Sequence, residues 1–205
     1  MTYVKHTSEK QDGTASEPMT LFRDWLAQAE ASEPSLATAM TLATVSASGM
    51  PSARMVLLKD ADDRGVTFYT NLDSRKAADL RDNPVAALVF HWKSLKRQVR
   101  IEGAVEPVTE GEADAYFSTR PRGAQIGAWA SKQSAPLNGR FELERRVARY
   151  TAKFHVGTVP RPGFWSGFRV VPRRFEFWQE QAFRLHDRIV YTLGDNGWTT
   201  ERLYP

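Results

Sequence analysis

The 205-residue sequence contains no cysteine. Disulfide bonds, thiolate nucleophiles, iron–sulfur clusters and cysteine-ligated zinc are therefore excluded, and the composition fits a reducing compartment, so we expect a cytoplasmic protein. Long apolar runs are also missing, because the longest one, Val85 to Phe90, is far shorter than the roughly 20 residues of a membrane-spanning helix. The first residues lack the apolar core of an export signal. We expect no membrane span and no export signal.

Several common catalytic motifs are absent. The patterns G-x-G-x-x-G and G-x-x-x-x-G-K-[ST] do not occur, which removes the usual support for Rossmann-type dinucleotide binding and P-loop phosphoryl transfer. No G-x-S-x-G nucleophile elbow is present. The histidines are scattered and form no H-E-x-x-H pattern, so we expect no metal site. The sequence thus disfavours the common hydrolases and the NAD-dependent dehydrogenases.

Positive charge is in slight excess and is carried mainly by arginine. Lysine and arginine number 28 against 24 acidic residues, and 20 of the 28 are arginine. A basic chain raises nucleic acid as a partner, but these residues are not gathered in one tail. Arginine pairs with phosphates and carboxylates through two parallel hydrogen bonds. The excess therefore favours small anionic ligands, although many single arginines are expected at the solvated surface.

The polarity pattern indicates a short polar arm followed by one domain. Residues 1–18 are polar and show no aliphatic periodicity, so we expect a flexible arm. Residues 19–205 are expected to form a single domain that can bury a sizeable core. Apolar residues at helical spacing predict a helix over residues 21–29, which Thr20 caps and which ends before Pro34.

Short β-rich runs separated by turn residues dominate the rest of the chain. Their close spacing predicts a mainly β, α+β fold built on an antiparallel barrel or sandwich. The predicted strands cover residues 39–46, 52–59, 66–71, 85–92, 97–105, 168–179, 183–193 and 198–205, with a hairpin turn at 194–197. Further helices are predicted from Ser74, from Thr109 with the capping-box pair Thr109 and Glu112, and across residues 138–154.

The clearest candidate for an anion site is the triplet Ser74-Arg75-Lys76 at the start of a predicted helix. The positive end of the helix dipole disfavours cations in the first turn. A bound phosphate would resolve this conflict, because backbone N–H groups, the Ser74 hydroxyl and two cations would all face it. Alternatively, Ser74 is only an N-cap and both long side chains reach back into water.

Two further cationic groups lie at the ends of predicted elements. Between Arg54 and Lys59 both faces of the strand are apolar, which predicts a central strand. Arg54 and Lys59 lie on opposite faces of the strand, so they contact different groups unless a bulge changes the alternation. Alternatively, both side chains simply reach solvent. Arg120 and Arg122 follow a predicted helix, and Tyr116 lies one turn before Arg120 on the same face. A phenol beside a guanidinium can grip a phosphate, or it can form a stacked surface pair.

A line of cations is predicted near the C-terminus. Strand alternation places Arg184, His186 and Arg188 on one face, with Leu185 pointing away. Two flanking guanidinium groups disfavour imidazolium, which keeps His186 neutral and able to hydrogen-bond a phenolate-like oxygen. The alternative is an exposed edge strand whose charges prevent aggregation. Groups that can read the edge of a heteroaromatic ring are supplied by Gln98, Gln133, Ser134, Trp178 and Gln179.

With these motifs in order, the chain resembles the pyridoxine (pyridoxamine) 5′-phosphate oxidase family. The resemblance extends from Leu21 to Pro205. The motifs that carry it are RMVLLK (54–59), FYTNLDSRKA (68–77), RQVRIEG (97–103), YFSTRPRGAQIGAWASKQS (116–134), FWSGFRV (164–170), EFWQ (176–179) and RLHDR (184–188). It implies an FMN-binding split β-barrel that forms a homodimer with FMN at the subunit interface, and it implies no nucleic-acid or membrane partner.

The resemblance also implies a role for each matching residue. The positions that match FMN-binding residues are Arg54, Met55, Val56, Leu57, Leu58, Lys59, Tyr69, Thr70, Arg75, Lys76, Gln98, Gln133, Ser134, Trp178 and Arg188. Those that match the substrate site are Lys59, Tyr116, Arg120, Ala124, Arg184, Leu185 and His186, of which the first three hold the substrate phosphate. Arg184 and His186 are the implied catalytic residues, the former as an orienting cation and the latter as a hydrogen-bond partner of the ring oxygen.

The implied reaction transfers a hydride from C4′ of pyridoxine or pyridoxamine 5′-phosphate to flavin N5, and dioxygen then reoxidises the flavin and yields hydrogen peroxide. The product, pyridoxal 5′-phosphate, belongs to vitamin B6 synthesis and salvage. Two alternatives stay open: a flavin oxidase of the same fold for another heteroaromatic ring, such as those of the phenazine pathway, and a non-catalytic FMN- or nucleic-acid-binding module.

Three features of this chain depart from the family pattern. Ala124 stands where a serine usually contacts the substrate phosphate, so we expect weaker substrate binding without loss of activity. Glu180 stands where a glycine is common, which affects the local turn and its charge. The arm before Leu21 lacks the Arg-x-x-Tyr pattern that often covers the site, so any lid differs in this chain.

Overall fold

The computed structural model describes residues 17–205, so nearly all of the predicted arm lies outside the described residues. The helices are α1 (Pro18–Ser32), α2 (Arg75–Asp82), α3 (Glu110–Thr119), α4 (Arg122–Ala130), α5 (Glu142–Lys153) and the short 3₁₀ turn η1 (Ala182–Arg184). The strands are β1 (Ala39–Val45), β2 (Pro51–Leu57), β3 (Asp60–Asp62), β4 (Gly65–Asn71), β5 (Val85–Trp92), β6 (Arg97–Pro107), β7 (Trp165–Gln179), β8 (Asp187–Gly194) and β9 (Gly197–Arg202). The predicted mainly β, α+β class is confirmed.

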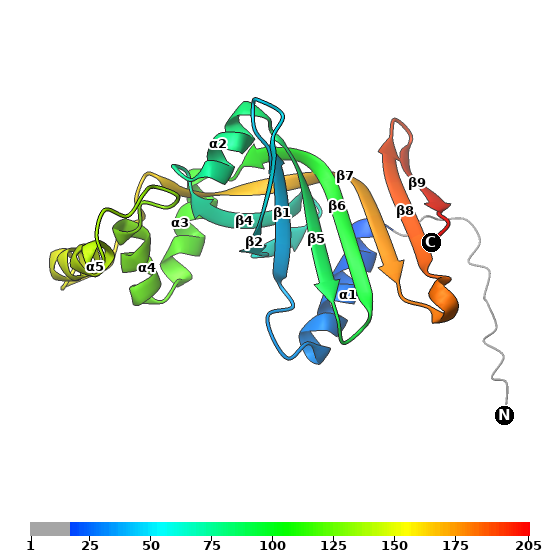
Figure 1. Ribbon diagram of the computed structural model, residues 1–205, viewed down its shortest axis with the longest axis horizontal. Coiled ribbons are helices and arrows are strands. Elements are labelled where there is room, and N and C mark those ends of the chain that lie inside the picture. Colours follow the sequence, from blue (N-terminus) through cyan, green and yellow to red (C-terminus); the bar gives the residue numbers. More distant parts are fainter. Residues whose placement is uncertain (1–16) are drawn as a thin grey trace.

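The strands form one antiparallel sheet that curls on itself (Figure 1). Its order is β2-β1-β5-β6-β7-β4-β3, with β8 paired to β7 and β9 paired to β8. One edge of β7 pairs with β6 over almost its whole length. The other edge pairs with β4 in the first half and with β8 in the second half. The long strand β7 therefore connects the two ends of the molecule.

A bulge lets β6 and β7 bend together. The register of the two strands shifts between Glu102 and Gly103. A Cβ atom at Gly103 would lie 2.0 Å from the carbonyl oxygen of Val171, so only glycine allows the backbones to approach this closely. The bulge explains how one continuous sheet can close into a half-barrel instead of staying flat.

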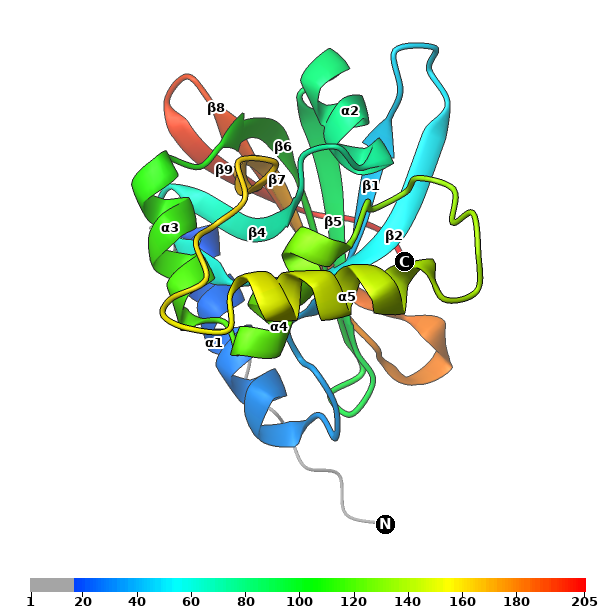
Figure 2. The ribbon, with the colours of Figure 1, turned by 90° about the vertical axis from the view of Figure 1, so that its left-hand side faces the viewer.

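The hydrophobic core lies inside the curl, and α1 covers one end of it (Figure 1). Phe22 of α1 is fully buried, and its ring lies 5.0 Å from that of Phe90. Trp92 is buried beside it and donates its indole N–H to the carbonyl oxygen of Ala37 at 2.8 Å. The helices α3, α4 and α5 gather at the opposite side of the sheet, where they face the viewer in Figure 2.

The structure corrects the predicted limits of several helices. The first helix begins at Pro18, with Glu17 and not Thr20 as its N-cap, because proline suits the first turn of a helix. Helix α4 was not predicted, since Gly123 and Gly127 interrupt its apolar pattern; Arg122 therefore begins a helix instead of following one. The predicted helix over residues 138–154 begins only at Glu142.

Two strand predictions are wrong. Strand β2 is an edge strand of the sheet and not a central one, because its second apolar face lines a cavity and open surface; Met55 is 62% exposed. Residues 183–186 are not part of a strand, since β8 begins at Asp187. Phe183 and Arg184 adopt left-handed backbone angles, with φ of 58° and 62°, which form a tight turn and break the predicted alternation. None of the helices within residues 17–205 is long and apolar enough to cross a membrane.

Candidate active site

A cavity of about 640 Å³ lies between β2, β4, α3 and α4. Its volume is in the range of pockets that hold small ligands. It brings together many of the residues predicted for the cofactor and the substrate: Met55, Val56, Leu57, Lys59, Tyr69, Thr70, Lys76, Tyr116, Arg120, Ala124 and Gln133. Leu58 does not line it, because its side chain is buried in the core.

Three aromatic rings form one wall of this cavity. The rings of Tyr69 and Tyr116 stack with centroids 4.2 Å apart, and Trp165 stacks on Tyr69 at 5.5 Å. A Cβ atom at Gly167, opposite Tyr69 on β7, would lie 2.7 Å from the tyrosine ring, so the glycine leaves the space in which the ring lies. Trp165 was not among the predicted site residues, because a single aromatic residue at the start of a strand is a common core feature.

Arg120 has a buried nitrogen without a hydrogen-bond partner among the described residues. Its guanidinium carbon lies 4.7 Å from the centre of the Trp165 ring, and its Nη1 is the unpaired atom. Burial lowers the pKa of Arg120 from its usual value. Lys59 is on the same wall, with its Nζ 5.7 Å from the centre of the Tyr116 ring. Two cations that face a cavity with an unsatisfied donor are suited to an anionic ligand.

The start of α4 adds backbone donors to this end of the cavity. Its N-cap is Pro121, which has no side-chain acceptor to cap the first turn. Pro121 and Ala124 both line the cavity, so the positive end of the helix lies at its wall. The position of Ala124, where a serine was expected, is therefore next to the first-turn N–H groups of α4.

A second cationic group gathers at the start of α2. The Nζ atom of Lys76 donates to Oε1 of Gln133 at 2.8 Å and to the hydroxyl of Thr70 at 3.1 Å. Burial and the nearby positive charge of Arg54 lower the pKa of Lys76. Arg54 does not line the cavity and pairs with Asp79 at 3.6 Å. The pKa of Arg54 is lowered, chiefly by burial and further by the charge of Arg75, although Asp79 raises it.

The predicted triplet is thus a cationic helix start with Ser74 as its N-cap residue, but the Ser74 side chain makes no capping hydrogen bond. The Ser74 hydroxyl donates to the carbonyl oxygen of Asn71 at 2.7 Å. The N–H of Arg75 instead donates to the Ser134 hydroxyl at 3.3 Å. Arg75 and Ser134 line an adjacent cavity of about 620 Å³, which shares Gln133 with the first one.

The remaining predicted residues lie together at the other end of the molecule. Gln98, Trp178 and Arg188 are direct neighbours across β6, β7 and β8. The His186 ring lies 4.6 Å from that of Trp178, and its Nδ1 accepts a hydrogen bond from the Gln181 N–H at 3.2 Å. A neutral ring in this position therefore carries its proton on Nε2 and can donate it in a hydrogen bond.

Arg184 and Leu185 belong to the turn that precedes β8, and both are exposed. The strand parity that was expected to turn Leu185 away does not apply, because the segment is not a strand. The turn follows the end of β7, whereas Trp165 of the cavity begins the same strand. At about 3.3 Å per residue, the thirteen steps from Trp165 to Trp178 span roughly 40 Å along the strand. The two residue groups therefore lie far apart within one chain (Figure 1).

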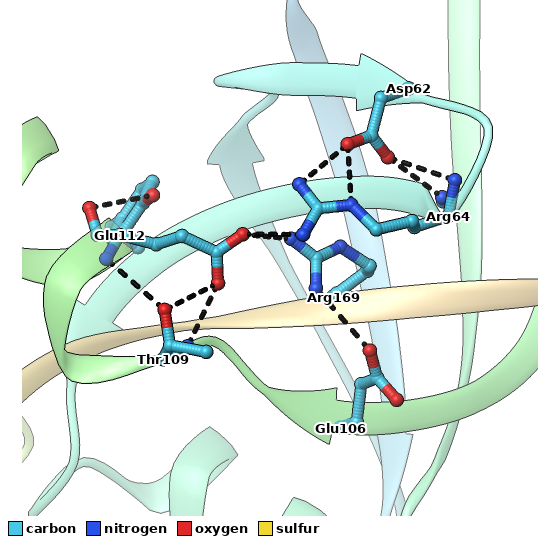
Figure 3. A network of polar contacts seen from close by, with 8 residues as sticks. Asp62, Arg64, Glu106, Thr109, Glu112 and Arg169 are labelled. Carbon is cyan, nitrogen blue, oxygen red and sulfur yellow. Dashed lines mark hydrogen bonds and ion pairs between the residues drawn. The ribbon is translucent and has the colours of Figure 1, made fainter.

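An ion-pair network fixes the start of α3 (Figure 3). The Glu112 carboxylate accepts hydrogen bonds from Arg169 at 2.6 Å and Thr109 N–H at 2.9 Å, and pairs with Arg64 at 2.8 Å. Thr109 and Glu112 form the predicted capping box. The Thr109 N–H and then Arg169 lower the pKa of Glu112 to about 2. Because Tyr116 is one turn further along α3, this network holds the cavity wall in place.

Known protein families match both parts of the chain. A family model described as pyridoxamine 5′-phosphate oxidase matches residues 27–154, and one described as pyridoxine 5′-phosphate oxidase C-terminal dimerisation region matches residues 165–205. Proteins named pyridoxine/pyridoxamine 5′-phosphate oxidase include one from Maricaulis maris that is 61% identical over 92% of this chain and 86% of its own length. Another, from Brucella anthropi, is 54% identical over 97% of this chain and 100% of its own length.

Solved structures agree with the fold. PhzG from Burkholderia lata, in complex with tetrahydrophenazine-1-carboxylic acid, has a TM-score of 0.90 and 34% identity and covers 98% of this chain and 99% of its own. A pyridoxamine 5′-phosphate oxidase-related, FMN binding protein from Nostoc punctiforme has a TM-score of 0.74 at 15% identity, which concerns the fold alone; it covers 94% of this chain and 100% of its own. The expected split β-barrel is confirmed, and the chain belongs to the pyridoxine/pyridoxamine 5′-phosphate oxidase family of oxidoreductases.

Proposed function

We propose that the protein is an FMN-dependent oxidase that converts pyridoxine or pyridoxamine 5′-phosphate to pyridoxal 5′-phosphate in the cytoplasm, with dioxygen as acceptor and hydrogen peroxide as product. Relatives with 54% to 61% identity carry the corresponding name. The observation that carries the proposal is the unpaired, buried Nη1 of Arg120 beside Lys59 and Tyr116 in the cavity. These groups would hold the substrate phosphate and anchor the pyridine ring.

FMN fits the second cationic group. Besides burial, the charge of Arg75 lowers the pKa of Arg54, and the charge of Arg54 lowers the pKa of Lys76; Asp79 is the carboxylate that pairs with Arg54. A phosphate would relieve this repulsion, with the Ser134 hydroxyl and Gln133 amide as further hydrogen-bonding groups. Held by these residues, FMN would supply the hydride acceptor of the reaction and the route by which the electrons reach dioxygen.

The complete site requires two copies of the chain. One subunit would supply the cavity and the cations at the start of α2, and the other would supply Gln98, Trp178 and Arg188 beside the flavin. The roughly 40 Å between these groups along β7 supports this arrangement. The second group also lies mostly within the matched dimerisation region, residues 165–205. We therefore propose a homodimer with FMN at its subunit interface, as two-fold symmetry would give two equal sites.

Arg184 and His186 would act on the substrate ring from the second subunit. The Arg184 guanidinium would orient the ring and favour negative charge on its oxygen. The Nε2–H of His186, fixed by the bond that Nδ1 accepts from Gln181, would donate to that oxygen. Leu185 would contribute apolar contact between them. These residues orient the substrate so that C4′ faces the flavin.

Oxygen uptake by the FMN-reconstituted protein tests the proposal. We expect uptake with pyridoxine 5′-phosphate, and a KM at least about tenfold higher for unphosphorylated pyridoxine. Arg120→Ala should raise the KM for the phosphorylated substrate by about 10- to 100-fold while FMN stays bound. Arg145→Ala, at an exposed arginine of α5, is the matched control. No uptake with either phosphorylated vitamer, or an unchanged KM for Arg120→Ala, would disprove the assignment.

A second candidate is an oxidase for another heteroaromatic ring. The structural likeness to PhzG at 34% identity and the missing hydroxyl at Ala124 favour it. Lys59, Tyr116 and Arg120 argue against it, because together they form an anchor for a phosphate. Competition between pyridoxine 5′-phosphate and tetrahydrophenazine-1-carboxylic acid as substrates separates the two functions.

A further inference from the structure

Glu176 is a buried carboxylate in the middle of β7. Its side chain is 2% exposed, and its strand neighbours are Arg100 on β6 and Val190 on β8. The flanking residues Phe175 and Phe177 point into the core on the opposite face of the strand. An ionised carboxylate so deep in the sheet is stable only when cations compensate its charge.

Three arginines surround this carboxylate, and one of them, Arg188, donates two hydrogen bonds to the same carboxylate oxygen. Oε1 accepts hydrogen bonds from Nε and Nη2 of Arg188 at 2.9 and 2.7 Å. Oε2 lies 3.3 Å from Arg100 Nη1 and 3.5 Å from Arg174 Nη2. The contacts to Arg188 are therefore the shortest and best defined of the group.

Arg188 is held from a second side as well. Its Nη1 donates to the carbonyl oxygen of Tyr204 at 2.9 Å. A guanidinium has five N–H donors; contacts with the residues that the structure describes use three of them and leave two available. A side chain fixed in this way loses little conformational entropy when it binds a ligand.

We propose that Glu176 is a positioning residue that holds the Arg188 guanidinium in the orientation in which its free N–H groups bind FMN. This inference rests on the proposed function, because it requires Arg188 to contact the flavin. Glu176 itself does not line the cavity; it acts through Arg188. In the proposed dimer, the carboxylate of one subunit thus determines the affinity of the site whose phosphate group the other subunit holds.

Glu102 provides a control of equal charge on the same face of the sheet, with a side chain that is 38% exposed against 2% for Glu176. It accepts from Arg174 at 3.1 Å and from Arg100 at 3.5 Å, two of the cations that surround Glu176. No hydrogen bond or ion pair joins it to Arg188. Glu102→Gln and Glu176→Gln therefore remove equal charge from the same ion-pair group, but only the second frees Arg188.

The experiment measures release of FMN from the holoenzyme by recovery of flavin fluorescence. Glu176→Gln should raise the Kd of FMN by about 10- to 100-fold, and Glu102→Gln by less than about threefold. In an Arg188→Ala background, Glu176→Gln should have almost no additional effect, because its partner is already gone. If the single variant unfolds, the double variant Glu176→Gln/Arg174→Gln replaces it, because it restores the charge balance. The double variant should show the same weak FMN binding.

The possible results separate the role of Glu176 from the proposed oxidase function. Equal effects of Glu102→Gln and Glu176→Gln, or a full effect of Glu176→Gln in the Arg188→Ala background, would show a general structural role and overturn the inference. Normal FMN affinity of Arg188→Ala would overturn it too, while the proposed oxidase function would stand. A wild-type protein that binds no FMN would overturn both.

Discussion

A mixed dimer reveals whether two subunits build each site. Lys76→Ala damages the cationic group at the start of α2, and Arg188→Ala damages the group at the end of β7. In a heterodimer with one variant in each subunit, two-fold symmetry places both changes in one site and leaves the other site intact. The two residues belong to groups roughly 40 Å apart along β7, so both can contact the same FMN only if the dimer brings them together across its interface.

The magnitude follows from the lost contacts. Removal of one charge-assisted hydrogen bond of about 2.7 kcal/mol weakens FMN binding about 100-fold. With free FMN at about ten times the wild-type Kd, an intact site is about nine-tenths loaded and a damaged one about one-tenth. The heterodimer should therefore carry about half of the wild-type flavin and half of its activity, while each parental homodimer carries about one-tenth.

Two affinity tags on differently tagged subunits isolate the heterodimer for flavin absorbance and oxygen uptake. A heterodimer of Lys76→Ala with Arg75→Ala is the control, because both changes lie in the same group and damage both sites. If the Lys76→Ala and Arg188→Ala heterodimer is as poor in flavin as this control, each site lies within one subunit and the interface arrangement is wrong.

Three other predictions concern single residues. Ala124→Ser should restore a hydroxyl contact of about 0.5–1.5 kcal/mol and lower the KM for pyridoxine 5′-phosphate about 2- to 10-fold, which steady-state kinetics would detect; an unchanged KM would mean that backbone N–H groups already satisfy the phosphate. Arg184→Ala should lower kcat while FMN stays bound, and an unchanged kcat would refute its role. Glu112→Gln should cost about 1–2 kcal/mol of unfolding free energy at pH 7 in urea titrations at fixed subunit concentration.

The contribution of Glu112 to the free energy of unfolding should decrease at low pH. The pKa of Glu112 is lowered from 4.5 to about 2 in the folded protein, so its stabilisation is complete above the unfolded-state pKa. It is lost as the pH falls from about 4.5 towards 2. The difference in stability between wild type and Glu112→Gln should therefore shrink over this range, and a constant difference would contradict the network in Figure 3.

Local sequence patterns predicted the elements whose stability is local. The capping box at Thr109 and Glu112 is present, because side-chain spacing alone determines it. The β-rich runs at residues 39–46 and 85–92, bounded by turn residues, are the strands β1 and β5. Tyr116 and Arg120 share the cavity, as their helical spacing indicated.

Features that depend on distant partners could not be predicted in this way. The left-handed backbone of Phe183 and Arg184 has no glycine to announce it, so the segment resembled a strand. The apolar faces of β2 indicated a central strand, because a sequence does not distinguish a neighbouring layer from a cavity wall. The division of the site residues between the two ends of β7 became visible only with the register of the sheet.

The most direct test of the proposed function is the stoichiometry of the reaction catalysed by the purified protein with bound FMN. With pyridoxine 5′-phosphate in air, pyridoxal 5′-phosphate, consumed dioxygen and hydrogen peroxide are measured together. We predict a yellow protein and a ratio of about 1:1:1 among the three. A protein that binds FMN but forms no pyridoxal 5′-phosphate, or forms it without dioxygen uptake, would contradict the proposal.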